Sequence, residues 1–181
     1  MVLYRRDEAK EKAVNPLEIA LQMETDGKEF YRKASERATD SLGKELFAQL
    51  ADEEDYHAMK AKHIFESLKQ GNSLAEDEVS FDQGKTVRSI FAKASKKLDA
   101  RVEASSGELD AVTVALDMEE KSRKFYEEHS READDGVEVR FFRALTAEEQ
   151  GHYLALVDYR EYLNDPSGWF AKTEHSSLDG G

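Results

Sequence analysis

The chain has 181 residues, a formal net charge of −13 and no cysteine, so disulfides, thiolate metal sites and iron–sulfur centres are excluded. Its acidity argues against nucleic acid or an anionic membrane as a partner, and no apolar run is long enough for a membrane span. Because only Pro16 and Pro166 occur, near the two ends, the chain between them is free to be helical. We expect a single domain, 1–181, in the cytoplasm.

The predicted helices follow a charged N-terminal arm at residues 1–14. Asn15 before Pro16 is typical of a helix start, and small or apolar residues then recur at three- and four-residue steps as far as residue 38. The same spacing predicts helices over about 42–70, 107–134 and 137–163. Residues 71–106 form a long connector that contains a short amphipathic helix near 86–98. Residues 165–181 form a tail in which Trp169 and Phe170 are expected to dock on the bundle or on a second subunit.

The chain contains an internal duplication, because residues 17–64 align with 112–159 at a constant offset of 95 residues. Each half has the pattern of two helices joined by a short turn, and the long connector joins the halves. This arrangement predicts an all-α fold, a four-helix bundle built from two pseudo-symmetric helical hairpins with a crossover between them.

Each half carries one glutamate in its first helix and a Glu-x-x-His in its second. The six residues are Glu24, Glu54, His57, Glu119, Glu149 and His152. Glu-x-x-His places both side chains on one helix face, one turn apart. The midpoint of 24 and 54 is 39, within the turn, and the midpoint of 119 and 149 is 134, within the second turn. If the halves pair pseudo-symmetrically, all six side chains meet at one height in the core.

Four carboxylates on core-facing positions would be destabilised by desolvation and mutual repulsion, and no Lys or Arg falls on these positions. Two divalent cations would neutralise four glutamates, with a neutral imidazole completing each site. Carboxylate and imidazole ligands suit iron, manganese or zinc. A single Glu-x-x-His is more often a solvated helix face, but two copies at matching depth favour a dinuclear metal site.

Several neighbouring residues allow two interpretations. Tyr31 and Tyr126 lie seven residues after the first-helix glutamates, and each either hydrogen-bonds a ligand carboxylate or packs as an ordinary core aromatic. Glu53 and Glu148 fall off the core-facing positions and are expected to face solvent or the connector. The remaining histidines have no matching partners and are expected to be structural or exposed: His63, His129 and His175.

With these residues the sequence resembles the ferritin-like superfamily and, within it, the rubrerythrin branch, over roughly residues 16–164. The resemblance implies that the six residues hold two iron ions, with manganese or zinc as alternatives in one or both positions. It further implies reduction of hydrogen peroxide or dioxygen through those metals. Rubrerythrins draw electrons through a C-terminal rubredoxin domain, which this cysteine-free chain lacks, so an external electron donor is expected. Rubrerythrins also carry an extra glutamate, which exchanges with a histidine, where this chain has Ser122.

Two other functions stay open. One is a ferritin-type iron-binding or iron-oxidising protein for storage or delivery, and the other is a structural or interaction bundle whose metal only supports folding. Gly27 and Ser122, one turn from Glu24 and Glu119, are expected to leave volume for a small oxidant. The long connector and the apolar tail also predict a homodimer.

Overall fold

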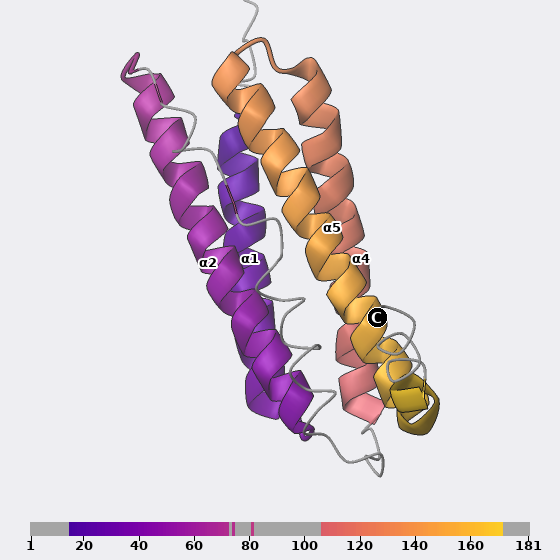
Figure 1. Ribbon diagram of the computed structural model, residues 1–181. Helices are drawn as coiled ribbons and strands as arrows, with labels where there is room; N and C mark the ends of the chain where they lie inside the picture. Colours follow the sequence, from indigo (N-terminus) through magenta and orange to yellow (C-terminus); the bar gives the residue numbers. More distant parts are fainter. Residues whose placement is uncertain (1–14, 73, 75–80, 82–105, 172–181) are drawn as a thin grey trace, which may run out of the picture.

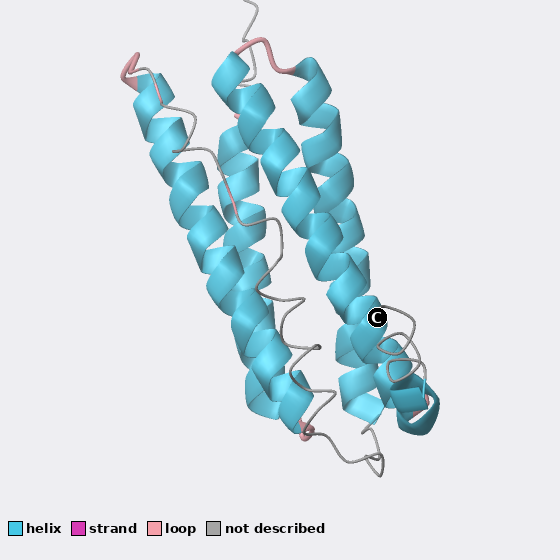
Figure 2. Cartoon of the chain, viewed as in Figure 1, coloured by secondary structure: helices cyan, strands magenta, loops and turns pink. Residues whose placement is uncertain are grey.

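The computed structural model describes residues 15–72, 74, 81 and 106–171, and the regular structure of these residues is entirely helical (Figure 2). The all-α prediction is therefore confirmed. The predicted arm at 1–14, the short helix near 86–98 and the end of the tail, with His175, lie outside the described residues.

The first hairpin consists of α1 (Pro16–Arg37) and α2 (Ser41–Lys69). Asn15 caps α1 as predicted, since its side chain accepts a hydrogen bond of 2.8 Å from the backbone N–H of Leu17. Asp40 caps α2 by accepting from the backbone N–H of Leu42 and Gly43. After α2 the chain turns at Gly71, whose φ of +74° is in the left-handed region that favours glycine.

The second hairpin consists of α4 (Ser106–Glu132) and α5 (Gly136–Asn164). Asp135 caps α5 by accepting from the backbone N–H of Val137 at 2.7 Å. All four helices agree with the predicted ranges to within two residues at each end.

The two hairpins lie side by side and form a four-helix bundle (Figure 1). Within each hairpin the helices pack closely, and the hairpins meet through α1 with α4 and through α2 with α5. Hydrogen bonds from Tyr31 to Glu119 and from Tyr126 to Glu24 show that α1 and α4 run antiparallel. The turn between α1 and α2 lies at the same end as the start of α4. The connector therefore joins opposite ends of the bundle, as a crossover requires.

The apolar core is divided into two clusters. The cluster near the α1–α2 turn contains Leu46, Phe47, Leu156 and Tyr159 among its buried residues. The cluster near the α4–α5 turn is built around Ile64, Tyr126, Phe141, Phe142 and Leu145. Between the two clusters lie the buried charged side chains of the six predicted residues. Burial of the apolar groups stabilises the bundle by roughly 25 cal/mol per Å² and thereby offsets the desolvation of this polar layer.

The beginning of the tail docks on its own bundle. Residues 166–171 are helical, and the Trp169 ring lies 5.6 Å from that of Tyr162, so the indole is 7% exposed. The described part of the tail, residues 165–171, thus packs on its own chain and does not argue for a second subunit; the homodimer itself stays a prediction.

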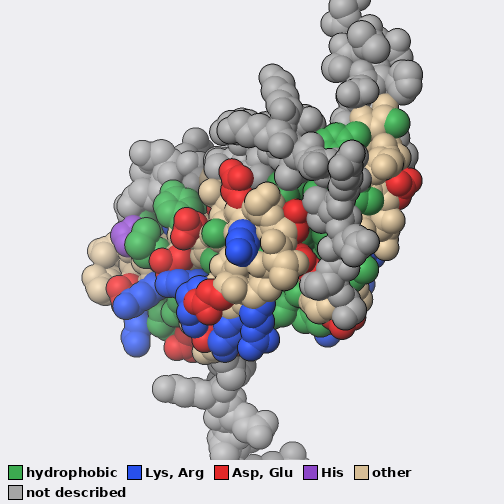
Figure 3. All heavy atoms as spheres, turned by 90° about the horizontal axis from the view of Figure 1, so that it is seen from below, with side chains coloured by type: hydrophobic (Ala, Val, Ile, Leu, Met, Phe, Trp, Pro, Cys, Tyr) green, Lys and Arg blue, Asp and Glu red, His purple; other side chains and the backbone are tan. Residues whose placement is uncertain are grey.

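Seen from below, the end of the molecule that carries the α1–α2 turn has acidic and basic side chains intermixed on its surface (Figure 3). Among the described residues, no helix is both long and apolar enough to cross a membrane.

Candidate dinuclear metal centre

All six predicted residues meet in the middle of the bundle, and each is at most 4% exposed. They form two overlapping groups in which one potential ligand atom from each residue lies within 4.8 Å of the others. One group is Glu24, Glu54, His57 and Glu149, and the other is Glu54, Glu119, Glu149 and His152. Glu54 and Glu149 belong to both groups. The arrangement therefore offers two adjacent sites, each with its own glutamate and histidine and with two shared carboxylates.

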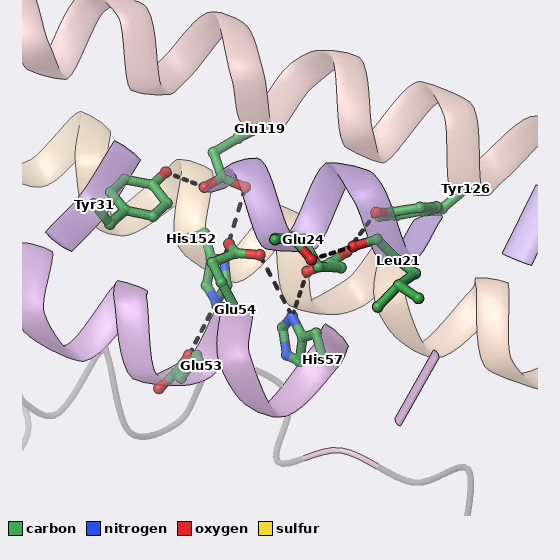
Figure 4. A network of polar contacts seen from close by, with 10 residues as sticks. Leu21, Glu24, Tyr31, Glu53, Glu54, His57, Glu119, Tyr126 and His152 are labelled. Carbon is green, nitrogen blue, oxygen red and sulfur yellow. Dashed lines mark hydrogen bonds and ion pairs between the residues drawn. The ribbon is translucent and has the colours of Figure 1, made fainter. Parts of the chain in front are cut away.

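Two tyrosines connect the hairpins at this layer (Figure 4). The Tyr31 hydroxyl on α1 donates to Oε1 of Glu119 on α4, and the Tyr126 hydroxyl on α4 donates to Oε1 of Glu24 on α1. Burial and the nearby carboxylates raise the pKa of both phenols well above the usual value, so both remain donors. In the structure each tyrosine therefore hydrogen-bonds a carboxylate of the centre, as the first of the two interpretations expected.

The two histidines lie next to each other, with ring centroids 5.5 Å apart and nearly parallel planes. Nδ1 of His57 is 3.2 Å from Oε2 of Glu24. Nδ1 of His152 is 3.2 Å from Oε1 of Glu54 and 3.6 Å from Oε2 of Glu119. Both rings thus direct the same nitrogen towards the carboxylates (Figure 4).

The expectation that Glu53 and Glu148 face solvent is wrong, and the connector, which they were alternatively expected to face, lies mostly outside the described residues. Oε2 of Glu53, on α2, lies 2.9 Å from Nε2 of His152 on α5, and the Glu53 side chain is only 13% exposed. Glu148 is 1% exposed, and its carboxylate lies within 4.8 Å of ring nitrogens of His57 and His152. The cause is that α2 faces α5 at this height, so a position off the core-facing stripe of its own hairpin is covered by the other hairpin. A carboxylate on the outer nitrogen fixes the orientation of a histidine ring.

The four glutamates of the centre fall into two pairs whose pKa values are shifted in opposite directions. Burial acts to raise the pKa of Glu24, but hydrogen bonds with Glu54 and His57 lower it to about 2. For Glu119 burial acts in the same direction, but the charge and hydrogen bond of His152 lower its pKa overall. Burial and the charge of the neighbouring glutamate raise the pKa of Glu54 and of Glu149 well above the ordinary value. Without a cation, the surroundings therefore favour the protonated form of the two shared glutamates and the ionised form of the other two.

The residues fit a pair of divalent cations. Three buried atoms of the site make no hydrogen bond of good geometry with any described residue: Glu119 Oε2, Glu149 Oε1 and His152 Nδ1. Buried polar atoms are normally paired, and these three lie on residues of the second group. Carboxylate and imidazole together are the donor set of iron, manganese and zinc sites.

The space beside Gly27 is filled, whereas the sequence predicted that it would be open. A Cβ placed on Gly27 would lie 3.3 Å from Cδ of Glu54, so the shared carboxylate occupies the space that was expected to receive an oxidant. Ser122 is half-buried. The ring of Phe81, from the connector, packs on the His57 ring at a centroid distance of 5.0 Å. His129 packs on Phe125 as a structural residue, and His63 is exposed.

Sequence reasoning also missed a second buried polar cluster, at the end of the bundle near the α1–α2 turn. Glu108 on α4 is 4% exposed and accepts hydrogen bonds from the Tyr159 hydroxyl at 2.8 Å and from the Thr39 hydroxyl at 2.9 Å. The backbone N–H of Asp40 donates to the same carboxylate. No repeated motif marks Glu108, because the position 95 residues earlier is Ala13.

A comparison with protein-family profiles matches rubrerythrin over residues 15–159. The chain belongs to the rubrerythrin family. The matched region is the ferritin-like di-iron domain, and it includes all six residues of the candidate centre. A search of curated proteins finds no match.

Among solved structures, this rubrerythrin-family chain is similar to a hypothetical protein from Pyrococcus furiosus, with 21% sequence identity and a TM-score of 0.60. The similarity covers 82% of this chain and 87% of that chain. At this level of identity it supports the fold alone.

Proposed function

We propose that this protein is a dinuclear non-haem iron oxidoreductase that reduces hydrogen peroxide or dioxygen with electrons from an external donor. The observation that carries the proposal is the pair of overlapping four-residue groups that share Glu54 and Glu149. Such a layer supplies two adjacent cation sites with balanced charge, because four carboxylates offset two divalent ions. Iron bound there would supply redox and Lewis-acid chemistry.

The chain's own groups would organise that chemistry. Glu24 with His57, and Glu119 with His152, would each hold one side of the centre, while Glu54 and Glu149 would lie between the two ions. Tyr31 and Tyr126 would hold one oxygen of Glu119 and one of Glu24, so these carboxylates would keep a fixed orientation. The protons that Glu54 and Glu149 hold in the absence of metal would have to leave when cations bind.

The proposal is tested by anaerobic loading with ferrous iron and measurement of peroxide consumption with a one-electron reductant. Catalytic turnover, with many peroxide molecules reduced per centre, is the expected result. A single stoichiometric oxidation that stops when the ferrous iron is exhausted would contradict the peroxidase function.

Ser122 favours the ferritin-type alternative as a second candidate. Since a serine stands where rubrerythrins carry an additional glutamate, the redox-linked exchange of that ligand has no carboxylate here. An iron-oxidising protein needs no such exchange. Retention of many ferric ions per chain after repeated ferrous additions and air oxidation would identify this alternative.

A further inference from the structure

A series of aromatic rings leads from the candidate metal centre to the tail end of the bundle. The Tyr31 ring, whose hydroxyl donates to Glu119, lies 6.1 Å from Phe47, and Phe47 lies 5.9 Å from Tyr159, measured between ring centroids. Tyr159 is 6.2 Å from Tyr162, and Tyr162 is 5.6 Å from Trp169. We call these five residues the ring series. Its members are buried, and four of the five are tyrosine or tryptophan, the side chains most readily oxidised by one electron.

Comparison of the two duplicated halves shows which rings of the ring series have an aromatic counterpart in the other half and which do not. Both halves keep the first two rings, since Tyr126 and Phe142 match Tyr31 and Phe47 at the offset of 95 residues. The positions that match Tyr159, Tyr162 and Trp169 are Ile64, Ser67 and Leu74. Ile64 is fully buried and packs the second core cluster without an aromatic ring. The outer part of the ring series is therefore not a requirement of packing in this fold.

Tyr159, in the middle of the ring series, is equipped for proton transfer. Burial and the hydrogen bond to Glu108 raise the pKa of its phenol well above the ordinary value, so the phenol is protonated at neutral pH. Loss of an electron from such a phenol requires an acceptor for its proton, and Oε1 of Glu108 lies 2.8 Å from the hydroxyl. Gly43 makes room for this pair, because a Cβ there would lie 2.7 Å from Glu108 Oε1 and would overlap the phenol.

We propose that the ring series conducts single electrons from the tail end of the bundle to the candidate metal centre. This inference rests on the proposed function, which supplies the electron acceptor. Reduction of one hydrogen peroxide to two water molecules consumes two electrons and two protons. Tyr31 replaces the electron that the centre takes and passes its phenolic proton to Glu119. Tyr159 replaces the electron of Tyr31 across the Phe47 ring, and Trp169 replaces that of Tyr159 across the Tyr162 ring; neither intervening ring is itself oxidised. Tyr159 passes its phenolic proton to Glu108 when oxidised and recovers it when reduced. The electron lost from Trp169 is replaced by an external one-electron reductant.

Trp169 is the one tryptophan in the sequence, so its oxidation can be followed without ambiguity. The experiment adds hydrogen peroxide to the iron-loaded chain without a reductant, then measures peroxide consumption and maps oxidised residues by peptide mass spectrometry. The expected result is oxygen addition at Trp169 in the wild type, and its loss in Tyr159→Phe and in Tyr162→Leu, which removes the intervening ring. Tyr159→Phe leaves two consecutive rings without a hydroxyl, while ring packing is kept.

The matched control is Tyr153→Phe, a half-buried tyrosine of α5 outside the ring series, which should retain the wild-type oxidation of Trp169. Metal-free protein treated with the same peroxide measures direct attack on the indole. Circular dichroism of each variant checks the fold, and if Tyr159→Phe does not fold, Tyr162→Leu decides the question.

The outcomes separate the two proposals. Equal Trp169 oxidation in the wild type and in the folded series variants, with peroxide still consumed, overturns the ring series alone. No peroxide consumption by the iron-loaded wild type overturns the proposed function, and the ring series with it because its electron acceptor is then missing. Loss of Trp169 oxidation only in the series variants supports both.

Discussion

At the scale of single residues, the four glutamates of the centre differ in the direction of their pKa shifts and in the number of cation positions that they can serve. Glu24 and Glu119 each accept a phenol hydrogen bond and lie beside a histidine, which favours their ionised form. Glu54 and Glu149 belong to both groups of potential ligands, and burial together with the neighbouring carboxylates raises their pKa values well above the ordinary value while no cation is bound. Loss of a shared carboxylate should therefore affect both cation positions at once.

Replacement Glu54→Gln keeps the side-chain shape but removes the charge, and metal content after loading should fall to about half of the wild-type value or less. Asp52→Asn, an exposed change on the same helix, is the matched control and should load normally. Metal analysis after removal of free ions measures both. Equal loading of Glu54→Gln and wild type would show that Glu54 is not a ligand.

Glu53→Gln should have a smaller effect, since Glu53 contacts the centre through the outer nitrogen of His152 and belongs to neither group of potential ligands. We expect metal affinity to weaken by roughly 10- to 100-fold while the stoichiometry at saturating metal is kept. Titration with a divalent cation under a competing chelator measures the affinity. A loss of stoichiometry as large as that of Glu54→Gln would instead place Glu53 among the ligands.

The pH response of the metal-free protein follows from the raised pKa values of Glu54, Glu149 and His152. A raised folded pKa means that the folded state binds more protons than the unfolded state. The resulting stability is fully present below the unfolded pKa and disappears as pH rises through the folded value. The metal-free protein should thus melt at a higher temperature at about pH 5.5 than at about pH 7.5. The lowered pKa values of Glu24 and Glu119 act only at more acidic pH.

The metal-loaded protein should respond in the opposite direction, because its ligands must lose their protons to keep the cations. Thermal melts of both forms over this pH range are the measurement. Parallel trends in the two forms would mean that the carboxylates do not share one buried site.

The six central residues were predictable because helical spacing and the position of the turn fix which side chains lie level within one hairpin. Glu53 and Glu148 were not, since their surroundings depend on how α2 and α5 face each other across the two hairpins. That register is set by packing between segments far apart in sequence, which local periodicity does not encode. The same limit explains Gly27, whose neighbouring space is filled by Glu54 from the next helix.

At the scale of the helices, the close approach of α2, α4 and α5 near the α1–α2 turn depends on one small residue, Gly43. Gly43, in the first turn of α2, faces the Tyr159 hydroxyl and Glu108, which come from α5 and α4. Three helices therefore meet at a position where an added side chain would have to displace Tyr159 and Glu108. The cap at Asn15 was predicted from the sequence, but this contact could not be, because nothing local distinguishes Gly43 from other helical glycines.

Gly43→Ala should destabilise the fold by about 1–3 kcal/mol, because the new methyl group displaces the Tyr159 hydroxyl and its carboxylate partner. The matched control is Gly107→Ala, at an exposed position of α4 with nothing within 4 Å of the added Cβ. That change should be neutral or slightly stabilising, since alanine favours helix over glycine. Chemical denaturation of the two variants measures the difference. Equal stabilities would contradict the crowding at Gly43.

At the scale of the whole molecule, the polar layer divides the core and also joins the hairpins. The two apolar clusters lie on either side of the candidate centre, and contact between the hairpins is less extensive than contact within them. The ligands of each proposed cation come from both hairpins, since Glu149 joins Glu24 and His57, and Glu54 joins Glu119 and His152. Bound metal should therefore hold the hairpins together.

Removal of metal by a chelator should lower the melting temperature and speed amide hydrogen exchange where α1 faces α4 and α2 faces α5. A cation present at 100 times its dissociation constant stabilises the folded state by about 2.7 kcal/mol. Exchange should change less at the capped starts of α2 and α5, far from the centre. Uniform acceleration along all four helices would indicate global loosening instead of separation of the hairpins.

Two reciprocal hydrogen bonds, from Tyr31 to Glu119 and from Tyr126 to Glu24, join the hairpins and bear on how the duplicated chain arose. Each half supplies one tyrosine, two glutamates and one histidine to the shared layer, in the same order along the chain. Two identical copies of a single hairpin, related by a twofold axis, would therefore present the same phenols, carboxylates and imidazoles as the present chain. A peptide of half this length could have assembled the centre by dimerisation before gene fusion joined the copies. Fusion would allow the two halves to diverge, as they do at the matching positions Ile64 and Tyr159.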